Sequence, residues 1–168
     1  CNRALASLEK YGNSKLGATV TAQRIAEVKF LRAHFYYKLI TVFRKVPWID
    51  EEVFKNNTQE KTPNDALTYQ QLYEKIIADF KTAYDVLPET QSERARAHKI
   101  AAASYLAKCY LDLAWGDGYE QTTGVSHINP TDMQKVIDYT DAVVGSNYGY
   151  LEDYGDIFLP EHKNSKES

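Results

Sequence analysis

The chain has 168 residues, of which 43% are hydrophobic and 26% are charged, so it is long and apolar enough to bury one globular core. Its formal net charge is -3 and its pI is near 5.8, which leaves no basic excess for a phosphate backbone and argues against nucleic acid as a partner. No apolar stretch approaches the roughly 20 residues of a membrane-spanning helix.

Apolar residues recur at helical spacing in about five segments, and no stretch alternates with the period of two that a half-buried strand shows. The fold is therefore predicted to be all-α. The first helix is expected to end near Gly12, and a helix-breaking stretch follows to about Thr19. The second is predicted over residues 21–45, before Pro47. Its buried face is expected to comprise Ile25, Val28, Leu31, Phe35, Leu39 and Val42.

Residues 48–67 form an acidic and polar linker that is expected to lie on the surface, with the acidic run 50–52 as a solvated loop rather than a metal site. The third helix is predicted over residues 68–88, because Thr68 and Gln71 have the spacing of a capping box. Its apolar face is expected to comprise Leu72, Ile76, Phe80, Ala83 and Leu87.

The fourth helix is predicted over residues 97–115, where alanines permit close approach of a neighbouring helix. The fifth is predicted over residues 130–145, because Asn129 can cap its first turn and Pro130 suits its first position. Beyond it, Phe158 and Leu159 are interpreted as an apolar anchor near the end.

The helices are expected to pair as two tetratricopeptide-like units, about 21–88 and 97–145, with antiparallel partners inside each unit. Residues 1–168 are thus interpreted as a single helical domain. Three residues of the third helix match three of the fifth at one constant offset: Ile77, Phe80 and Ala83 with Val136, Tyr139 and Ala142.

Arg32 is expected to be buried in an ion pair, because Leu31 and Phe35 beside it are expected to point inward and buried charges persist only when paired. Glu27 and Asp79 are its candidate partners. The cysteines Cys1 and Cys109 form no CxxC or CxxH unit, so neither a zinc site nor a redox motif is expected.

Enzymes are disfavoured as a class. No HExxH, GxSxG, P-loop or dinucleotide-binding pattern appears, and the four histidines are scattered without metal-ligand spacing. We therefore expect no catalytic residue, no metal and no cofactor. Cys109, inside an apolar helical run, is expected to be a buried free thiol.

Four motifs, in order along nearly the whole chain, resemble the SusD/RagB family. The most specific is AEVKFLRAHFYY at 26–37 with VPWI at 46–49, followed by LYEKIIADF at 72–80 and the alanine-rich 96–111. The fourth motif runs over residues 136–167 and includes Tyr148, Leu151, Tyr154 and Phe158. Family members usually carry a glycine before the Val-Pro of the first motif. This chain has Arg44 and Lys45 there, which alters a turn and not the assignment.

The resemblance implies an outer-membrane, surface-exposed lipoprotein that binds oligosaccharide and delivers it to a SusC-like TonB-dependent transporter. Family proteins are about three times longer than this chain. The membrane is therefore expected to be contacted only through a lipid anchor that this chain lacks, since Cys1 leads directly into a helical pattern. The alternative is a generic tetratricopeptide-like scaffold that binds a protein segment in its groove.

The candidate ligand site is the loop that begins with Trp115. Trp115 and Tyr119 bring flat apolar faces, Asp117 brings acceptors for sugar hydroxyls, and the intervening glycines allow a tight turn. The alternative is structural: Trp115 completes the core face of the fourth helix and Tyr119 covers it.

Overall fold

The computed structural model of the protein describes residues 1–58, 61–93, 95–115, 128–149 and 153–162. All regular elements in these ranges are helical, which confirms the predicted all-α class. They are α1 (Asn2–Ser7), a π-helical turn (Leu8–Gly12), α2 (Asn13–Leu16), α3 (Ala18–Phe43), α4 (Glu51–Lys55), α5 (Tyr69–Val86), α6 (Lys99–Ala114), α7 (Pro130–Val144), and two 3₁₀ turns at Tyr154–Phe158 and Pro160–His162.

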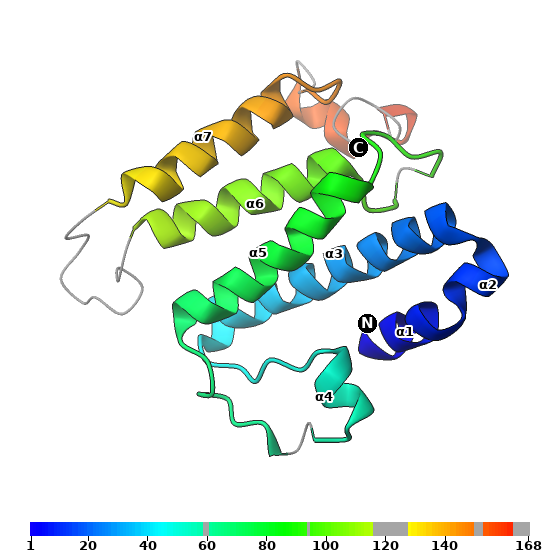
Figure 1. Ribbon diagram of the computed structural model, residues 1–168. Coiled ribbons are helices and arrows are strands. Elements are labelled where there is room, and N and C mark those ends of the chain that lie inside the picture. The colour runs from blue at the N-terminus through cyan, green and yellow to red at the C-terminus, as the bar shows by residue number, and fades with distance from the viewer. Residues whose placement is uncertain (59–60, 94, 116–127, 150–152, 163–168) are drawn as a thin grey trace.

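The long helices pair as predicted. α3 runs antiparallel to α5, α6 runs antiparallel to α7, and the contact between α5 and α6 joins the two pairs (Figure 1). The aromatic centre of this packing is Phe80 on α5, whose ring meets Phe30 of α3 edge-on at 5.4 Å and stacks on Tyr105 of α6 at 5.0 Å. The predicted apolar face of α5 is buried throughout, because it lies between α3 and α6.

The capping residues were also predicted correctly. Thr68 and Gln71 form the reciprocal capping box of α5, and the Asn129 side chain accepts from the backbone N–H groups of Thr131 and Asp132 at the start of α7. α6 begins two residues later than predicted, because the Nδ1 atom of His98 accepts from the N–H of Ala101 and so caps that helix.

The predicted buried face of α3 is wrong. Leu31, Phe35 and Val42 are 45%, 57% and 71% exposed, and Leu39 is exposed as well. The face that packs is a different one, formed by Ala26, Phe30, Ala33 and Ile40. α3 is apolar on two sides, and the side with two alanines lets the neighbouring helices approach more closely.

The breaks between elements also differ from the prediction. The chain stays helical through Gly12 and breaks at Gly17, whose φ of 80° is open to glycine without strain. Within the predicted surface linker Trp48 is buried, and Asp50 caps α4 by accepting from the N–H groups of Glu52 and Val53. The linker is thus partly a packed element.

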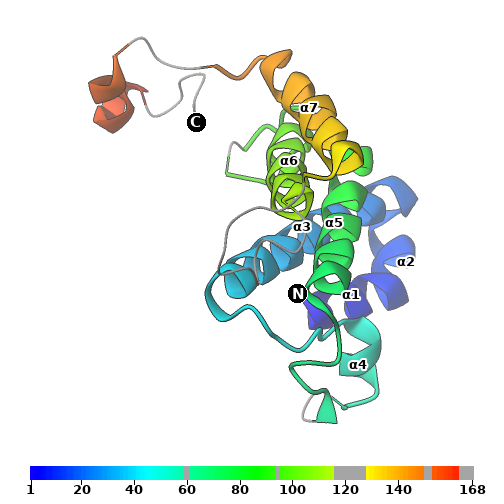
Figure 2. The ribbon, with the colours of Figure 1, turned by 90° about the vertical axis from the view of Figure 1, so that its left-hand side faces the viewer.

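Phe158 does not anchor the end of the chain in the helical body. It is 70% exposed and its ring contacts Tyr154 within the same 3₁₀ turn. Figure 2 shows this segment extending away from the helix pairs.

Arg32 holds four segments together. Its guanidinium donates to both carboxylate oxygens of Asp79 on α5, at 2.6 and 2.9 Å, and to Glu51 on α4 at 2.5 Å. It also donates to the side-chain oxygen of Asn2 at 3.1 Å and lies 5.2 Å from the Trp48 ring centre. The predicted burial and the pairing with Asp79 are confirmed.

Glu27 is not a partner of Arg32. It accepts a two-point hydrogen bond from Arg96, at 2.9 and 2.5 Å, and bonds from Arg24 and Gln91. This cluster holds the connection before α6 against α3. The acidic run beginning at Asp50 is likewise not a free solvated loop, since Glu51 pairs with Arg32.

His98 should make stability depend on pH. Its ring is half-buried and stacks on Tyr148 at 4.8 Å, and burial lowers the pKa of His98 and also that of His34. The pKa of His98 in the folded state lies below its unfolded value of about 6.5. The contribution of neutral His98 to the free energy of unfolding is therefore complete above about pH 6.5 and is lost as the pH falls through the folded-state pKa. We expect urea-unfolding free energy to decrease from pH 7.5 to pH 5.

The control is His98→Asn, which keeps a capping oxygen but no longer titrates. Its unfolding free energy should depend less steeply on pH over the same interval. An unchanged slope would remove His98 as a cause.

Candidate functional site

The loop predicted to contact ligand begins at the end of α6. Trp115 is the C-cap residue of that helix and is 44% exposed, so its ring is not part of the buried core. Asp117 and Tyr119 lie outside the described residues, and their role stays a prediction. The N–H of Asn129 donates to the carbonyl of Ala114 at 2.7 Å, which brings the two ends of the connection between α6 and α7 together.

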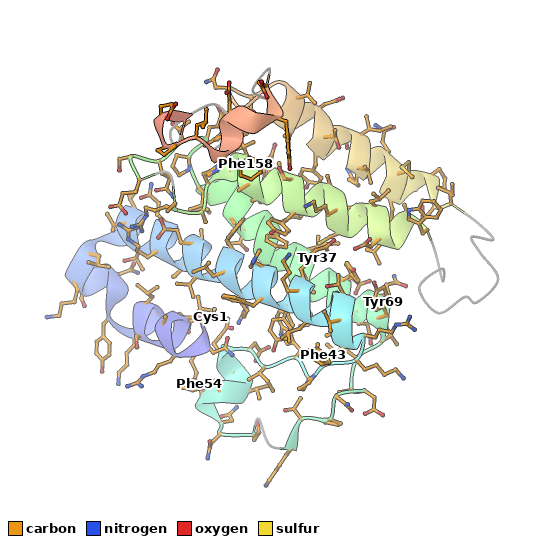
Figure 3. All side chains as sticks on the ribbon, turned by 180° about the vertical axis from the view of Figure 1, so that it is seen from behind. Cys1, Tyr37, Phe43, Phe54, Tyr69 and Phe158 are labelled. Carbon is orange, nitrogen blue, oxygen red and sulfur yellow. The ribbon has the colours of Figure 1, made fainter. Side chains whose placement is uncertain are left out.

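A groove of about 960 Å³ adjoins this point. It lies where α3 ends and α5 begins, beside the end of α6 and the start of α7, and Leu113 and Asn129 belong to its wall. Figure 3 shows Tyr69 and Phe43 at this end of the molecule. Two tyrosines and six charged residues stand out among the lining side chains: Tyr69, Tyr110, Arg44, Lys45, Lys81, Asp65, Glu74 and Asp132.

Tyr69 is held at the groove by a chain of hydrogen bonds. Its hydroxyl donates to that of Tyr73 at 2.9 Å, and the Tyr73 hydroxyl donates to the Asp112 carboxylate at 2.7 Å. Tyr73 is fully buried, and burial raises its pKa, so it stays a protonated donor. The chain also links α5 to α6, because Asp112 lies on α6.

Arg44 and Lys45, two cationic residues that line the groove, lie in an unusual turn after α3. Arg44 has φ 61° and ψ -58°, and the N–H of Lys45 donates to the carbonyl of Phe43 at 2.7 Å, closing a γ-turn centred on Arg44. This turn is strained for a residue with a Cβ atom. The turn falls on Arg44 and Lys45, the two residues that stand where the family resemblance implies a glycine.

Replacing Arg44 with glycine should therefore stabilise the protein. Relief of strain, offset in part by the greater freedom of glycine in the unfolded chain, is expected to raise the free energy of unfolding by about 1 kcal/mol in urea titrations. Arg44→Ala removes the same side chain but keeps the strain, so it should give no gain. Equal stability of the two variants would contradict the strained turn.

The lining of the groove suits non-covalent binding of a polar ligand with flat faces. Tyrosine rings offer stacking surfaces, while carboxylates, amides and cations offer hydrogen bonds to hydroxyl groups. Cys109 is fully buried and burial raises its pKa, which makes it a poor nucleophile. In the described ranges no group of three or more His, Cys, Asp or Glu side chains could hold a metal ion.

Sequence reasoning did not find the groove. Its lining residues are spread from Arg44 to Asp132, at no regular spacing, and only the packing of four helix ends gathers them. The one signal available was the pair Arg44 and Lys45, which stands where the resemblance implies a glycine and indicated an altered turn.

The chain is similar to proteins of one known family. Residues 1–111 match the SusD-like family described as starch-binding and associating with the outer membrane. The chain is 39% identical over 89 residues to SusD-like protein P2 of Formosa agariphila, which covers 51% of this chain and 17% of that protein. It is 28% identical over 148 residues to the starch-binding protein SusD of Bacteroides thetaiotaomicron, covering 87% of this chain and 23% of that protein.

A solved structure with xylogluco-oligosaccharide shares the fold, with a TM-score of 0.74 and 22% identity over 99% of this chain and 31% of the solved one. The chain thus spans less than a third of the length of these relatives. None of the helices in the described ranges has the length and apolar character that a membrane crossing requires. By the match over residues 1–111, the chain belongs to the SusD-like family, which is starch-binding and associates with the outer membrane.

Proposed function

We propose that this chain is the tetratricopeptide-like part of a surface-exposed outer-membrane lipoprotein, which binds oligosaccharide and delivers it to a SusC-like TonB-dependent transporter without catalysing a reaction. The family match over residues 1–111 carries the proposal. Two relatives support the ligand class, one named as starch-binding and one solved with xylogluco-oligosaccharide.

The end of the fold that holds the groove is the proposed place of sugar contact within this chain. Trp115 exposes a large flat ring at the base of the loop, and Tyr69 lies at the groove beside it. Aromatic faces pack against the apolar faces of sugar rings, while neighbouring carboxylates and amides accept and donate hydrogen bonds. Asp117 and Tyr119 are proposed to supply these contacts from the loop.

Replacing Trp115 or Tyr119 with alanine in the full-length protein should weaken oligosaccharide binding. Loss of one stacking ring is expected to raise the calorimetric Kd by about tenfold, because about 1.4 kcal/mol corresponds to that factor. The melting temperature of Trp115→Ala should change little, since the ring is already partly in water. The matched control is Tyr11→Ala, which removes an exposed ring that does not line the groove.

The opposite result would assign these rings to the structure. Lost stability with unchanged affinity would show that Trp115 and Tyr119 pack and do not bind. Equal loss of affinity for Tyr11→Ala would show that the effect is not local to the loop.

The transporter partnership has its own test. The lipoprotein, expressed together with a SusC-like transporter of the same organism, should co-purify with that transporter from solubilised outer membrane. Purification of the lipoprotein alone, together with capture of unrelated peptide segments in the groove, would favour a generic tetratricopeptide-like scaffold.

A further inference from the structure

A hydrogen-bond network of three residues runs from the groove into the core and ends on a carboxylate. Tyr69 lines the groove, and its hydroxyl oxygen lies 2.9 Å from that of Tyr73, one turn further along α5. Tyr73 is fully buried, and its hydroxyl oxygen lies 2.7 Å from a carboxylate oxygen of Asp112 on α6. Neither Tyr73 nor Asp112 lines the groove, so both could act on a bound ligand only through Tyr69.

The carboxylate of Asp112 fixes the direction of both hydrogen bonds. An ionised carboxylate has no proton to give, so the Tyr73 hydroxyl must donate to Asp112. A phenol carries a single proton, and Tyr73 therefore has none left for Tyr69 and can only accept from it. The opposite order would break the bond to the charged carboxylate, which is the strongest of the network. Tyr69 thus donates its own proton inward, away from the groove.

The surroundings of Asp112 keep this order in place. Burial raises the pKa of Tyr73, and the hydrogen bonds to Tyr69 and Asp112 raise it further, so Tyr73 stays protonated. A second phenol, Tyr37 of α3, meets the ring of Tyr73 edge-on at 6.5 Å and lies between α3 and α6 in Figure 3. Burial and the Asp112 carboxylate also raise the pKa of Tyr37. Both phenols near Asp112 therefore remain protonated at neutral pH.

We propose that Asp112 determines specificity at the groove, because through Tyr73 it makes Tyr69 a hydrogen-bond acceptor, and not a donor, towards a bound sugar. Any group that hydrogen-bonds to the Tyr69 oxygen from the groove must then bring its own proton. A free sugar hydroxyl does so, whereas an O-methylated hydroxyl does not. Asp112 and Tyr73 are positioning residues in this arrangement. Their role rests on the proposed binding of oligosaccharide at the groove.

Calorimetric titration of the full-length protein with O-methylated oligosaccharides tests this specificity. The probes are a maltooligosaccharide, a xylogluco-oligosaccharide and derivatives of both in which one hydroxyl at a time is methylated. Methylation of the hydroxyl that meets Tyr69 should raise the Kd by about tenfold, because it removes the donor and keeps the oxygen. In Asp112→Asn and Tyr73→Phe the same methylation should raise the Kd by less than about threefold, since the Tyr69 proton can then turn to the ether oxygen.

Two further variants distinguish this effect from steric exclusion and from a general effect of removing a charge. Tyr69→Phe should also reduce the penalty for methylation, whereas a steric clash would leave it unchanged. Asp85→Asn, the same chemical change at an exposed position of α5 that does not line the groove, should retain the full penalty. Urea unfolding of each variant establishes that it is folded.

The possible failures are distinguishable. An equal penalty in the unmodified protein, Asp112→Asn and Tyr73→Phe would overturn the role of Asp112 and leave oligosaccharide binding intact. Tolerance of methylation at every position in the unmodified protein would overturn it as well. If neither parent oligosaccharide gave saturable heat with the unmodified protein, the proposed binding at the groove would be contradicted together with the role of Asp112.

Discussion

Arg32→Met is expected to lower the free energy of unfolding by about 3–5 kcal/mol, which is the usual cost of removing one partner from a buried ion pair. Asp79 is buried and receives two hydrogen bonds from Arg32, so the substitution leaves a carboxylate without its counter-charge inside the fold. The same change releases Glu51 of α4 and the side chain of Asn2, the first residue of α1. Urea unfolding followed by circular dichroism measures the loss.

Two further variants test whether the loss of stability in Arg32→Met comes from the buried ion pair. Arg24→Met also breaks an ion pair, with Glu27, but its side chain is 41% exposed, so it should cost under about 1 kcal/mol. Arg32→Met combined with Asp79→Leu removes both buried charges and should recover part of the stability. An Arg32→Met variant no less stable than Arg24→Met would contradict the role of Arg32 in joining the segments.

Phe80→Ala should destabilise the protein by about 3–5 kcal/mol, the range found when a large buried aromatic ring is truncated. Phe80 is fully buried, and its contacts with Phe30 and Tyr105 connect α5 to the helices on both sides. Truncation would leave a cavity that three rigid helices cannot close. The free energy of unfolding in urea measures the effect.

The matched control is Val86→Ala on the same helix, where the side chain is already exposed and the loss should be within about 0.5 kcal/mol. Phe80→Leu should fall between the two. If Phe80→Ala were as stable as Val86→Ala, the two helix pairs would not depend on this aromatic contact.

Local signals in the sequence predicted the helices and their pairing well. Capping residues such as Thr68 and Asn129 act within one turn, so their geometry is encoded by neighbouring residues. The burial of Arg32 in an ion pair was predicted from a wrong premise, because Leu31 and Phe35 beside it are exposed. The sequence also did not decide between Glu27 and Asp79 as its partner.

Features that depend on distant residues were not predictable in this way. Spacing showed that Leu31, Phe35 and Val42 share a face of α3, but not that α5 packs against a different face. A helix with two apolar sides shows helical periodicity on both of them, so the pattern does not tell which side is buried. The groove was missed for the same reason, since its residues meet only after four helix ends have packed together.

Calorimetric titration of the full-length, unmodified protein with oligosaccharides tests the proposed function most directly. The probes are a maltooligosaccharide, a xylogluco-oligosaccharide and a panel of other glycans of similar length, with the monosaccharides as controls. We predict saturable heat with at least one oligosaccharide and much weaker binding of its monosaccharide, because several stacking and hydrogen-bonding contacts must act together. A folded protein that gives no saturable heat with any member of the panel would contradict the proposal.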